Sequence, residues 1–271
     1  MGPIGIFDSG YGGLTVLSAI RKKLPAYDFF YLGDNARAPY GNRSFEVVHE
    51  FTWQAVRFLF EQGCPLIILA CNTSSAKALR TIQQTQLPSF FPDRRVLGVI
   101  RPSTESISDW TKTNHVGILG TQGTIQSNSY SIELEKFAPQ VRVFQLACPM
   151  WVSLIENNYH QSEVGKSIIR QDVEKLMNMN DKIDTIVLAC THYPLIESLI
   201  KQIVGPDIKV YSQGNTVAEK LKLYLDRHPE IDNQLSKKGI AKYFTTENPE
   251  VFNEKTFQFL GDTINASSVH L

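Results

Sequence analysis

Short runs of apolar residues recur along this chain, and longer amphipathic stretches lie between them. The runs at 66–70 and 186–189 are almost continuously apolar, which is typical of strands that are covered on both faces of a parallel sheet. Residues 44–62 instead carry apolar side chains at helical spacing. The other strand-like runs are 4–7, 29–32, 96–100, 116–119 and 141–146. This alternation predicts an α/β protein with doubly wound parallel sheets between layers of helices.

A weak internal repeat indicates two such lobes. Residues 66–73, LIILACNT, resemble residues 185–192, TIVLACTH. Upstream of each lies a strand that enters a Gly-containing loop and then a helix (IFDSGYGG and ILGTQGT). We therefore expect two similar lobes, related by a pseudo-two-fold axis, with a cleft between them. Ligands of open α/β sheets bind beyond the carboxyl ends of the strands, and Cys71 and Cys190 occupy two such ends.

Composition argues against several classes of protein. The 271 residues hold 27 Lys and Arg against 27 Asp and Glu, which disfavours a nucleic-acid or anionic-membrane binder. No run of 18 apolar residues occurs, so we expect no transmembrane helix, and the N-terminus lacks the pattern of a signal peptide. Four cysteines without a CxxC motif indicate a protein of the reducing cytoplasm. The histidines show no HxH or HxxxH spacing, so we expect no metal site.

Cys71 and Cys190 are the strongest candidates for chemistry. A single cysteine in a buried strand is most often a small hydrophobic residue. Here, however, each cysteine ends its strand and is followed at once by polar groups, namely Asn72, Thr73, Thr191 and His192. The start of a helix at such a position offers backbone N–H groups that lower the pKa of a thiol. We interpret this pair as functional, and Cys64 and Cys148, which lack the setting, as structural.

Asp8, Ser9, His192 and Glu156 each have a structural and a functional interpretation. Asp8 fits a carboxylate that caps the following helix, or it points into the cleft, where Ser9 would hold a substrate oxygen. His192 lies two residues after Cys190, which favours a catalytic partner over a structural histidine. For Glu156, an exposed helical glutamate is the default.

The loop from Gly10 to Gly13 supports an interpretation from a different class, a nucleotide-binding module. The loop follows a strand and opens a helix, and Asp34 ends the second strand, where a ribose-binding carboxylate would lie. Against this, Thr15 stands in place of the third glycine, and Asp8 would repel a pyrophosphate. The chain also has no GxxxxGK[ST] motif. A nucleotide-binding module nevertheless stays as the alternative.

Six segments, in this order, resemble those of the glutamate racemase family: FDSGYGGL, APYG, ACNT, GVIRPS, GTQGTIQSNSY and ACTHYPL. The resemblance covers residues 4–226. It implies a cofactor-independent enzyme with two α/β lobes and the active site between them. It also implies that residues 1–97 plus 207–271 form one lobe and residues 98–206 the other.

The resemblance assigns roles residue by residue. Cys71 and Cys190 match the two catalytic thiols of the family. Asp8 and His192 match the residues that assist the thiols, and Glu156 matches a helper carboxylate near the histidine. The expected substrate contacts, from the match and from the hydroxyl groups of the loops, are Asp8, Ser9, Tyr40, Gly41, Asn72, Thr73, Thr121, Thr124, Thr191 and His192.

By resemblance, the protein interconverts L-glutamate and D-glutamate in the cytoplasm and supplies D-glutamate for peptidoglycan synthesis. The family uses no cofactor, and the resemblance allows a homodimer. A racemase for aspartate or another acidic amino acid is the alternative within the superfamily, because the shape of the pocket sets the length of the substrate. Residues 211–219, YSQGNTVAE, depart from the DSG-containing run that is usual there, and the C-terminal 40 residues match no motif.

Overall fold

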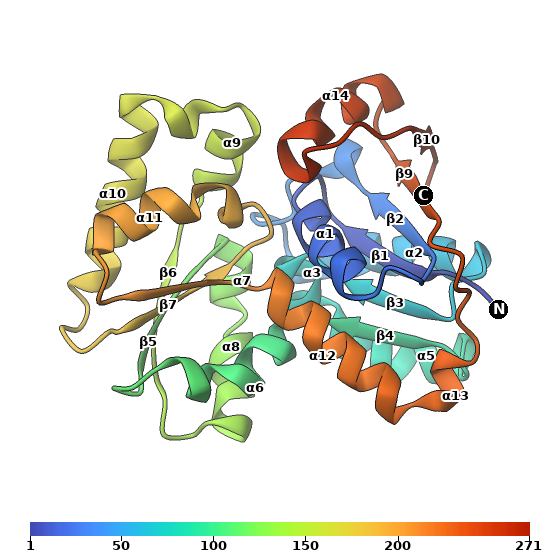
Figure 1. The fold of residues 1–271 in the computed structure, drawn as a ribbon, viewed down its shortest axis with the longest axis horizontal. Helices are drawn as coiled ribbons and strands as arrows, with labels where there is room; N and C mark the ends of the chain where they lie inside the picture. The colour runs from blue at the N-terminus through green and yellow to red at the C-terminus, as the bar shows by residue number, and fades with distance from the viewer.

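Two parallel β-sheets form the frame of the computed structural model, which describes residues 1–271 (Figure 1). The six-stranded sheet has the order β10-β9-β2-β1-β3-β4, and the four-stranded sheet has the order β6-β5-β7-β8. Every strand pair in both sheets is parallel. The α/β class with doubly wound parallel sheets, predicted from the alternation of apolar runs, is confirmed.

Helices cover both faces of the six-stranded sheet. Its strands are β1 (Ile4–Asp8), β2 (Phe29–Gly33), β3 (Leu66–Leu69), β4 (Arg95–Gly98), β9 (Ala241–Thr245) and β10 (Ala266–Ser268). Its helices are α1 (Gly13–Lys23), α2 (Phe45–Glu61), α3 (Asn72–Lys77), α4 (Leu79–Thr81), α5 (Leu87–Phe90), α12 (Gly214–Arg227), α13 (Pro229–Asp232) and α14 (Pro249–Leu260). Within β1, Ile6 packs in the cluster that contains α1 and α12, whereas Phe7 packs in the cluster that contains α2. Because successive side chains of a strand point to opposite faces, β1 is buried on both sides.

The four-stranded sheet is layered in the same way. Its strands are β5 (His115–Gly120), β6 (Arg142–Ala147), β7 (Thr185–Ala189) and β8 (Lys209–Ser212). Its helices are α6 (Ile100–Trp110), α7 (Gln122–Gln126), α8 (Ser129–Phe137), α9 (Trp151–Glu156), α10 (Glu163–Met177) and α11 (Glu197–Val204). Along β7, Val187 packs in the cluster that contains α6 and α8, and Leu188 packs in the cluster that contains α10 and α11. The strand β7 is thus covered by helices on both faces, which explains its near-continuous apolar sequence, as predicted.

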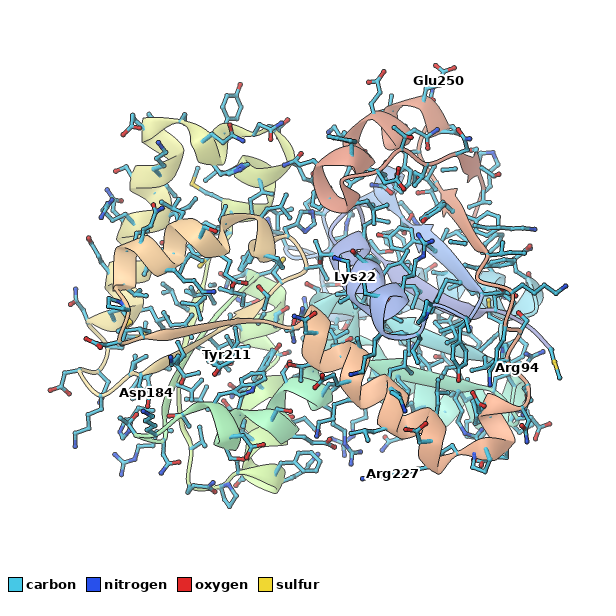
Figure 2. The ribbon with its side chains drawn as sticks, viewed as in Figure 1. Lys22, Arg94, Asp184, Tyr211, Arg227 and Glu250 are labelled. Carbon is cyan, nitrogen blue, oxygen red and sulfur yellow. The ribbon has the colours of Figure 1, made fainter.

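Charged side chains lie on the outside of the helices that cover the six-stranded sheet, as Figure 2 shows for Lys22, Arg227 and Glu250. Lys22 and Arg227 occupy the last turns of α1 and α12, and Glu250 occupies the first turn of α14. These positions match the helix dipole, which favours cations at the C-terminal end and anions at the N-terminal end. No helix combines the length and the apolar content that a bilayer span requires.

The elements differ from the expected ones in several places. The run at 96–100 divides, since β4 ends at Gly98 and Ile100 already begins α6. The strands β8, β9 and β10 were not expected, and β8 pairs with β7 in the second sheet although it lies after residue 207. The predicted division places residues 1–97 plus 207–271 in the first lobe and residues 98–206 in the second, and it stays a prediction. The strands show that the chain leaves the four-stranded sheet only after β8, which ends at Ser212.

The chain crosses between the sheets twice, after β4 and after β8, and Gln213 joins the two crossings. Its Nε2 lies 3.2 Å from the carbonyl oxygen of Val99 and 2.8 Å from the hydroxyl of Ser103. Its Oε1 accepts a hydrogen bond of 2.7 Å from Asn72 Nδ2. The hydroxyl of Tyr130 accepts from Gln213 Nε2 at 2.7 Å and donates to Asn72 Oδ1 at 2.8 Å. This buried ring of polar groups links α3 of the first lobe to α6 and α8 of the second.

Replacement of Gln213 by alanine tests this link. The substitution leaves the buried Nδ2 of Asn72 without its acceptor and removes the donor to the Tyr130 hydroxyl, so we expect Gln213→Ala to lower the free energy of unfolding by about 1–3 kcal/mol. The measurement is urea denaturation followed by circular dichroism. Gln202→Ala on the exposed face of α11 is the matched control, with an expected change within about 0.5 kcal/mol. Equal midpoints for the two variants would contradict the role of the ring.

Candidate active site

A cavity of about 70 Å³ lies where the carboxyl ends of the two sheets face each other. Its walls come from the segments that follow six strands. The lining residues are 9–10 after β1, 38–42 after β2, 71–73 after β3, 121 after β5, 148, 149, 152, 153 and 156 after β6, and 190–192 after β7. Both Cys71 and Cys190 line it. The cleft expected between the lobes, with one cysteine from each, is therefore present.

Cys71 lies between β3 and α3 and is almost completely buried. Its Sγ accepts a hydrogen bond from the backbone N–H of Ser74 at 3.4 Å and lies 3.4 Å from Ser9 Oγ. Burial, together with the nearby charge of Asp8, raises the pKa of Cys71 to about 11, and the hydrogen bonds from Ser9 and Ser74 only partly oppose this shift. Near neutral pH, this side chain is a protonated thiol.

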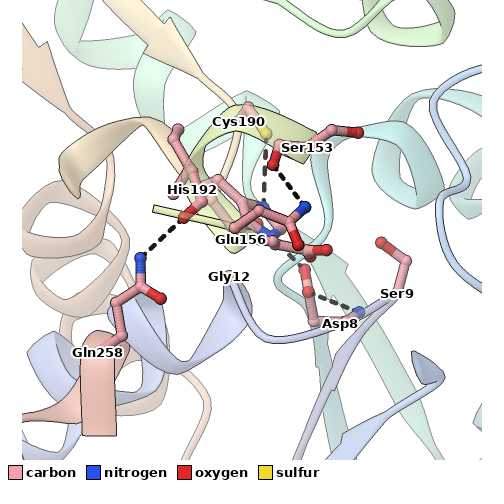
Figure 3. A network of polar contacts seen from close by, with 12 residues as sticks. Asp8, Ser9, Gly12, Ser153, Glu156, Cys190, His192 and Gln258 are labelled. Atoms are coloured by element: carbon pink, nitrogen blue, oxygen red, sulfur yellow. Dashed lines mark hydrogen bonds and ion pairs between the residues drawn. The ribbon is translucent and has the colours of Figure 1, made fainter. Parts of the chain in front are cut away.

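Cys190 lies at the end of a chain of three side chains (Figure 3). His192 Nδ1 is 3.9 Å from Cys190 Sγ, and His192 Nε2 is 2.8 Å from Glu156 Oε1. Burial alone would lower the pKa of His192, but its hydrogen bonds to Cys190 and Glu156 outweigh burial and raise that pKa to about 10. The histidine is therefore an imidazolium at neutral pH, held between the carboxylate of Glu156 and the sulfur of Cys190. We refer to this arrangement as the Glu156–His192–Cys190 chain.

Asp8 is fully buried behind the cavity wall and does not line the cavity. Its Oδ2 accepts from the backbone N–H of Gly10 at 2.9 Å, and its Oδ1 accepts from Thr191 Oγ1 at 3.3 Å (Figure 3). Burial raises the pKa of Asp8, while the charge of His192 and the N–H groups of Gly13 and Gly10 act in the opposite direction. In this structure both carboxylate oxygens of Asp8 accept hydrogen bonds from the protein, and its direct contact with a substrate stays a prediction. Its assistance to Cys71 stays a prediction.

The glycines after Asp8 allow the two lobes to approach closely. A Cβ atom on Gly12 would lie 2.3 Å from Thr191 Oγ1 and 2.5 Å from His192 Nδ1. A Cβ atom on Gly13 would lie 2.4 Å from the Cβ of Asp8. The loop is therefore pressed against the loop after β7, and the space that a pyrophosphate would need is filled by protein.

The carboxylate of Asp34 is also occupied. It forms an ion pair with Arg37, whose Nε lies 2.7 Å from Oδ2, and it accepts hydrogen bonds from the hydroxyls of Tyr40 and Thr246. A buried carboxylate with three partners in the protein is not free to bind a ribose. The glycine loop and Asp34 favoured a nucleotide-binding module in the sequence. In the structure, the loop packs against the second lobe and Asp34 binds protein groups, so neither is free to bind a nucleotide.

Comparison with known proteins gives the family. The model of the Asp/Glu/Hydantoin racemase family matches residues 9–219. The chain belongs to this family. It is 37% identical to a glutamate racemase of Streptococcus suis over 270 residues, which cover 99% of this chain and 98% of the relative.

Solved structures of the Asp/Glu/Hydantoin racemase family agree with this chain over its whole length. A glutamate racemase isoform from Bacillus anthracis superposes with a TM-score of 0.90 at 35% identity and covers 100% of this chain and 98% of its own. A glutamate racemase from Francisella tularensis, solved in complex with D-glutamate, gives a TM-score of 0.86 at 31% identity, with 99% and 97% covered. The resemblance inferred from the six sequence segments is confirmed.

Most of the expected contact residues line the racemase cavity. These are Ser9, Tyr40, Gly41, Asn72, Thr73, Thr121, Thr191 and His192. Several of their polar groups already have protein partners. For example, Tyr40 donates to Asp34, Asn72 donates to Gln213, and Thr191 donates to Asp8. Thr124 does not line the cavity, because its hydroxyl and its N–H face Thr121. It supports Thr121 from behind.

Other cavity residues were not expected. They are Gly10, Ala38, Pro39, Asn42, Cys148, Pro149, Val152 and Ser153. Helical spacing could have identified two of them, since Val152 and Ser153 precede Glu156 by four and three residues and so share its face of α9. Cys148, interpreted as structural, lines the cavity, and burial raises the pKa of its thiol. No group of three or more His, Cys, Asp or Glu side chains is placed to hold a metal ion.

The raised pKa of Cys71 predicts how this thiol reacts with iodoacetamide. Only the thiolate is alkylated, and below a pKa of about 11 the thiolate fraction grows about tenfold per pH unit. The alkylation rate of Cys71, followed by mass spectrometry of its peptide, should therefore keep rising between pH 7 and pH 9. A rate that levels off within this range would contradict the protonated resting state of Cys71.

Proposed function

We propose that this protein is a glutamate racemase that interconverts L-glutamate and D-glutamate. The observation that carries the proposal is the pair of thiols, one from each lobe, on the wall of a single cavity. The relatives described above, which are similar over the full length of the chain, are glutamate racemases. This similarity favours glutamate over aspartate or another acidic amino acid as the substrate.

Two thiols suit the chemistry of racemisation. The reaction removes the α-proton from one face of the amino acid and returns a proton on the other face. One group acts as the base while the other acts as the acid, and the roles exchange with the direction of the reaction. A cysteine has a reference pKa of about 8.5, close enough to neutrality for both roles.

The surroundings of the two thiols support an unequal resting state. Cys71 starts as the protonated thiol, because burial and Asp8 raise its pKa. His192 is protonated and is the counter-ion at hand when Cys190 is a thiolate. We infer that Cys190 begins as the base and Cys71 as the acid. In the reverse direction, the α-ammonium group of the substrate would offset the charge of Asp8 and so ease the loss of the proton from Cys71.

Fixed dipoles must stabilise the carbanion-like transition state if no cofactor takes up its charge. Ser9, Thr73, Thr121 and Thr191 line the cavity, and because the hydroxyl of Thr191 already donates to Asp8, the hydroxyls of Ser9, Thr73 and Thr121 are the donors for a substrate. Donors that are held in place before the reaction need little reorganisation as charge develops, and they act more strongly where water is excluded. We propose that these groups hold the two carboxylates of the substrate and that no cofactor is required.

The proposal extends to the metabolic role of the product, the division into lobes and the oligomeric state. We infer that D-glutamate made by the protein serves peptidoglycan synthesis in the cytoplasm, and that the two sheets with their helices act as separate lobes around the cavity. A homodimer stays a prediction, which sedimentation equilibrium of the purified protein would test.

The function is tested by incubating the protein with L-glutamate or D-glutamate and following the optical activity of the solution. We expect both enantiomers to approach the racemic mixture, with aspartate converted far more slowly. Activity should survive exhaustive chelation, and the protein should show no pyridoxal absorbance. Unchanged optical activity with both glutamate enantiomers would contradict the proposal, and metal-dependent activity would contradict its cofactor independence.

Serine variants of the two cysteines test the two-thiol mechanism. Each turnover needs both groups, so Cys71→Ser and Cys190→Ser should each slow racemisation by about 10²- to 10⁴-fold, the usual contribution of one acid or base. Elimination of chloride from 3-chloroglutamate needs only the base on one face, so each variant should retain it for one enantiomer. By resemblance, Cys71 deprotonates the D-form and Cys190 the L-form. The mechanism is wrong if both variants process the same enantiomer.

A further inference from the structure

Helix α14, in the C-terminal segment that matched no motif, reaches across to the second lobe. Gln258 Nε2 donates a hydrogen bond of 2.9 Å to the carbonyl oxygen of Ile155, which precedes Glu156 (Figure 3). The ring of Phe259 meets the ring of His192 edge to face, with 5.4 Å between the ring centres and an angle of 87°. Two adjacent residues of α14 thus contact His192 and the residue that precedes Glu156.

Each contact fixes a different part of the Glu156–His192–Cys190 chain. Glu156 is the last residue of the short helix α9, so a bond to the carbonyl of Ile155 anchors the end of that helix. Both nitrogens of His192 are engaged, one with Cys190 and one with Glu156. Phe259 adds an apolar contact to the imidazole ring, and the histidine is almost completely buried.

The helix is itself firmly attached to the first lobe. Phe259 stacks on Tyr11 with 5.9 Å between the ring centres, and Phe252 stacks on Tyr11 at 5.3 Å. Tyr11 belongs to the glycine loop after β1, the same loop that presses against Thr191 and His192. The geometry of His192 is thus set from the first lobe by two connected elements, the glycine loop and α14.

We propose that Gln258 and Phe259 are positioning residues, which hold Glu156 and His192 in the geometry that proton transfer at Cys190 requires. In this way, the position of Cys190's proton-transfer partners depends on the contact that α14 makes between the two lobes. The thiol on the opposite face, Cys71, has no contact with this helix through either residue. This inference rests on the proposed racemase function and adds a role for the C-terminal segment.

The test separates the two faces with the enantiomers of 3-chloroglutamate. The base removes the α-proton, the electron pair of that C–H bond forms the Cα–Cβ double bond, and chloride leaves with the electrons of the C–Cl bond. Water then hydrolyses the resulting enamine to 2-oxoglutarate and ammonium, which can be measured. The Cys190-dependent enantiomer is the one whose elimination is lost in Cys190→Ser.

We expect Phe259→Ala to slow elimination from the Cys190-dependent enantiomer by roughly ten- to a hundred-fold, because small misplacements of a catalytic group have effects of this size. Elimination from the other enantiomer should change by about twofold or less, because Cys71 keeps its surroundings. Gln258→Ala should show the same preference to a smaller degree. Phe259→Leu, which keeps an apolar cover over His192, should recover part of the lost rate.

Phe257→Ala is the matched control, since Phe257 neighbours both residues and is 59% exposed. Its two rates should equal those of the unaltered protein. Equal slowing of both enantiomers in Phe259→Ala and Gln258→Ala would show a purely structural role and overturn the inference, as would no slowing in either. If Phe259→Ala does not fold, Gln258→Ala, at a half-buried position, decides the question. An unaltered protein that does not racemise glutamate would instead overturn the proposed function.

Discussion

The close approach of Gly12 to Thr191 and His192 is the contact on which the rest of the site depends. No side chain fits between the glycine loop of the first lobe and the loop after β7, because a Cβ atom on Gly12 would lie within 2.5 Å of atoms from both residues. This contact brings the carboxyl ends of the two sheets face to face, so the polar groups at those ends share one cavity. Gln213 stabilises the same arrangement at the chain crossings.

Within that frame, two similar strand ends receive different electrostatic surroundings. Cys71 has a buried carboxylate nearby and accepts weak hydrogen bonds, and it stays protonated. Cys190 has an imidazolium that is oriented by Glu156. The two strand ends thus carry an asymmetric pair of thiols, which is what a reaction needs when one group must give a proton while the other takes one.

The sequence predicted the features that depend on local pattern. Continuous apolar runs identified most strands, and the repeated Ala-Cys ends identified both thiols, because burial and strand ends leave periodic signals. The strands β8, β9 and β10 left weaker signals and were not expected. The position of Asp8 behind the wall, the place of Cys148 in the cavity and the reach of Gln258 and Phe259 to the second lobe depend on long-range packing. The residues near 213 and in α14 matched no motif, yet they join the lobes.

The most direct test of the central claim is the fate of the α-proton when L-glutamate reacts in heavy water. Two bases on opposite faces predict that the first D-glutamate formed carries deuterium at the α-carbon, while the remaining L-glutamate keeps its proton. Proton NMR of samples taken early in the reaction, with the enantiomers separated, measures both. D-glutamate that retains the original proton, or deuterium that appears equally in both enantiomers from the start, would contradict a mechanism with one thiol on each face.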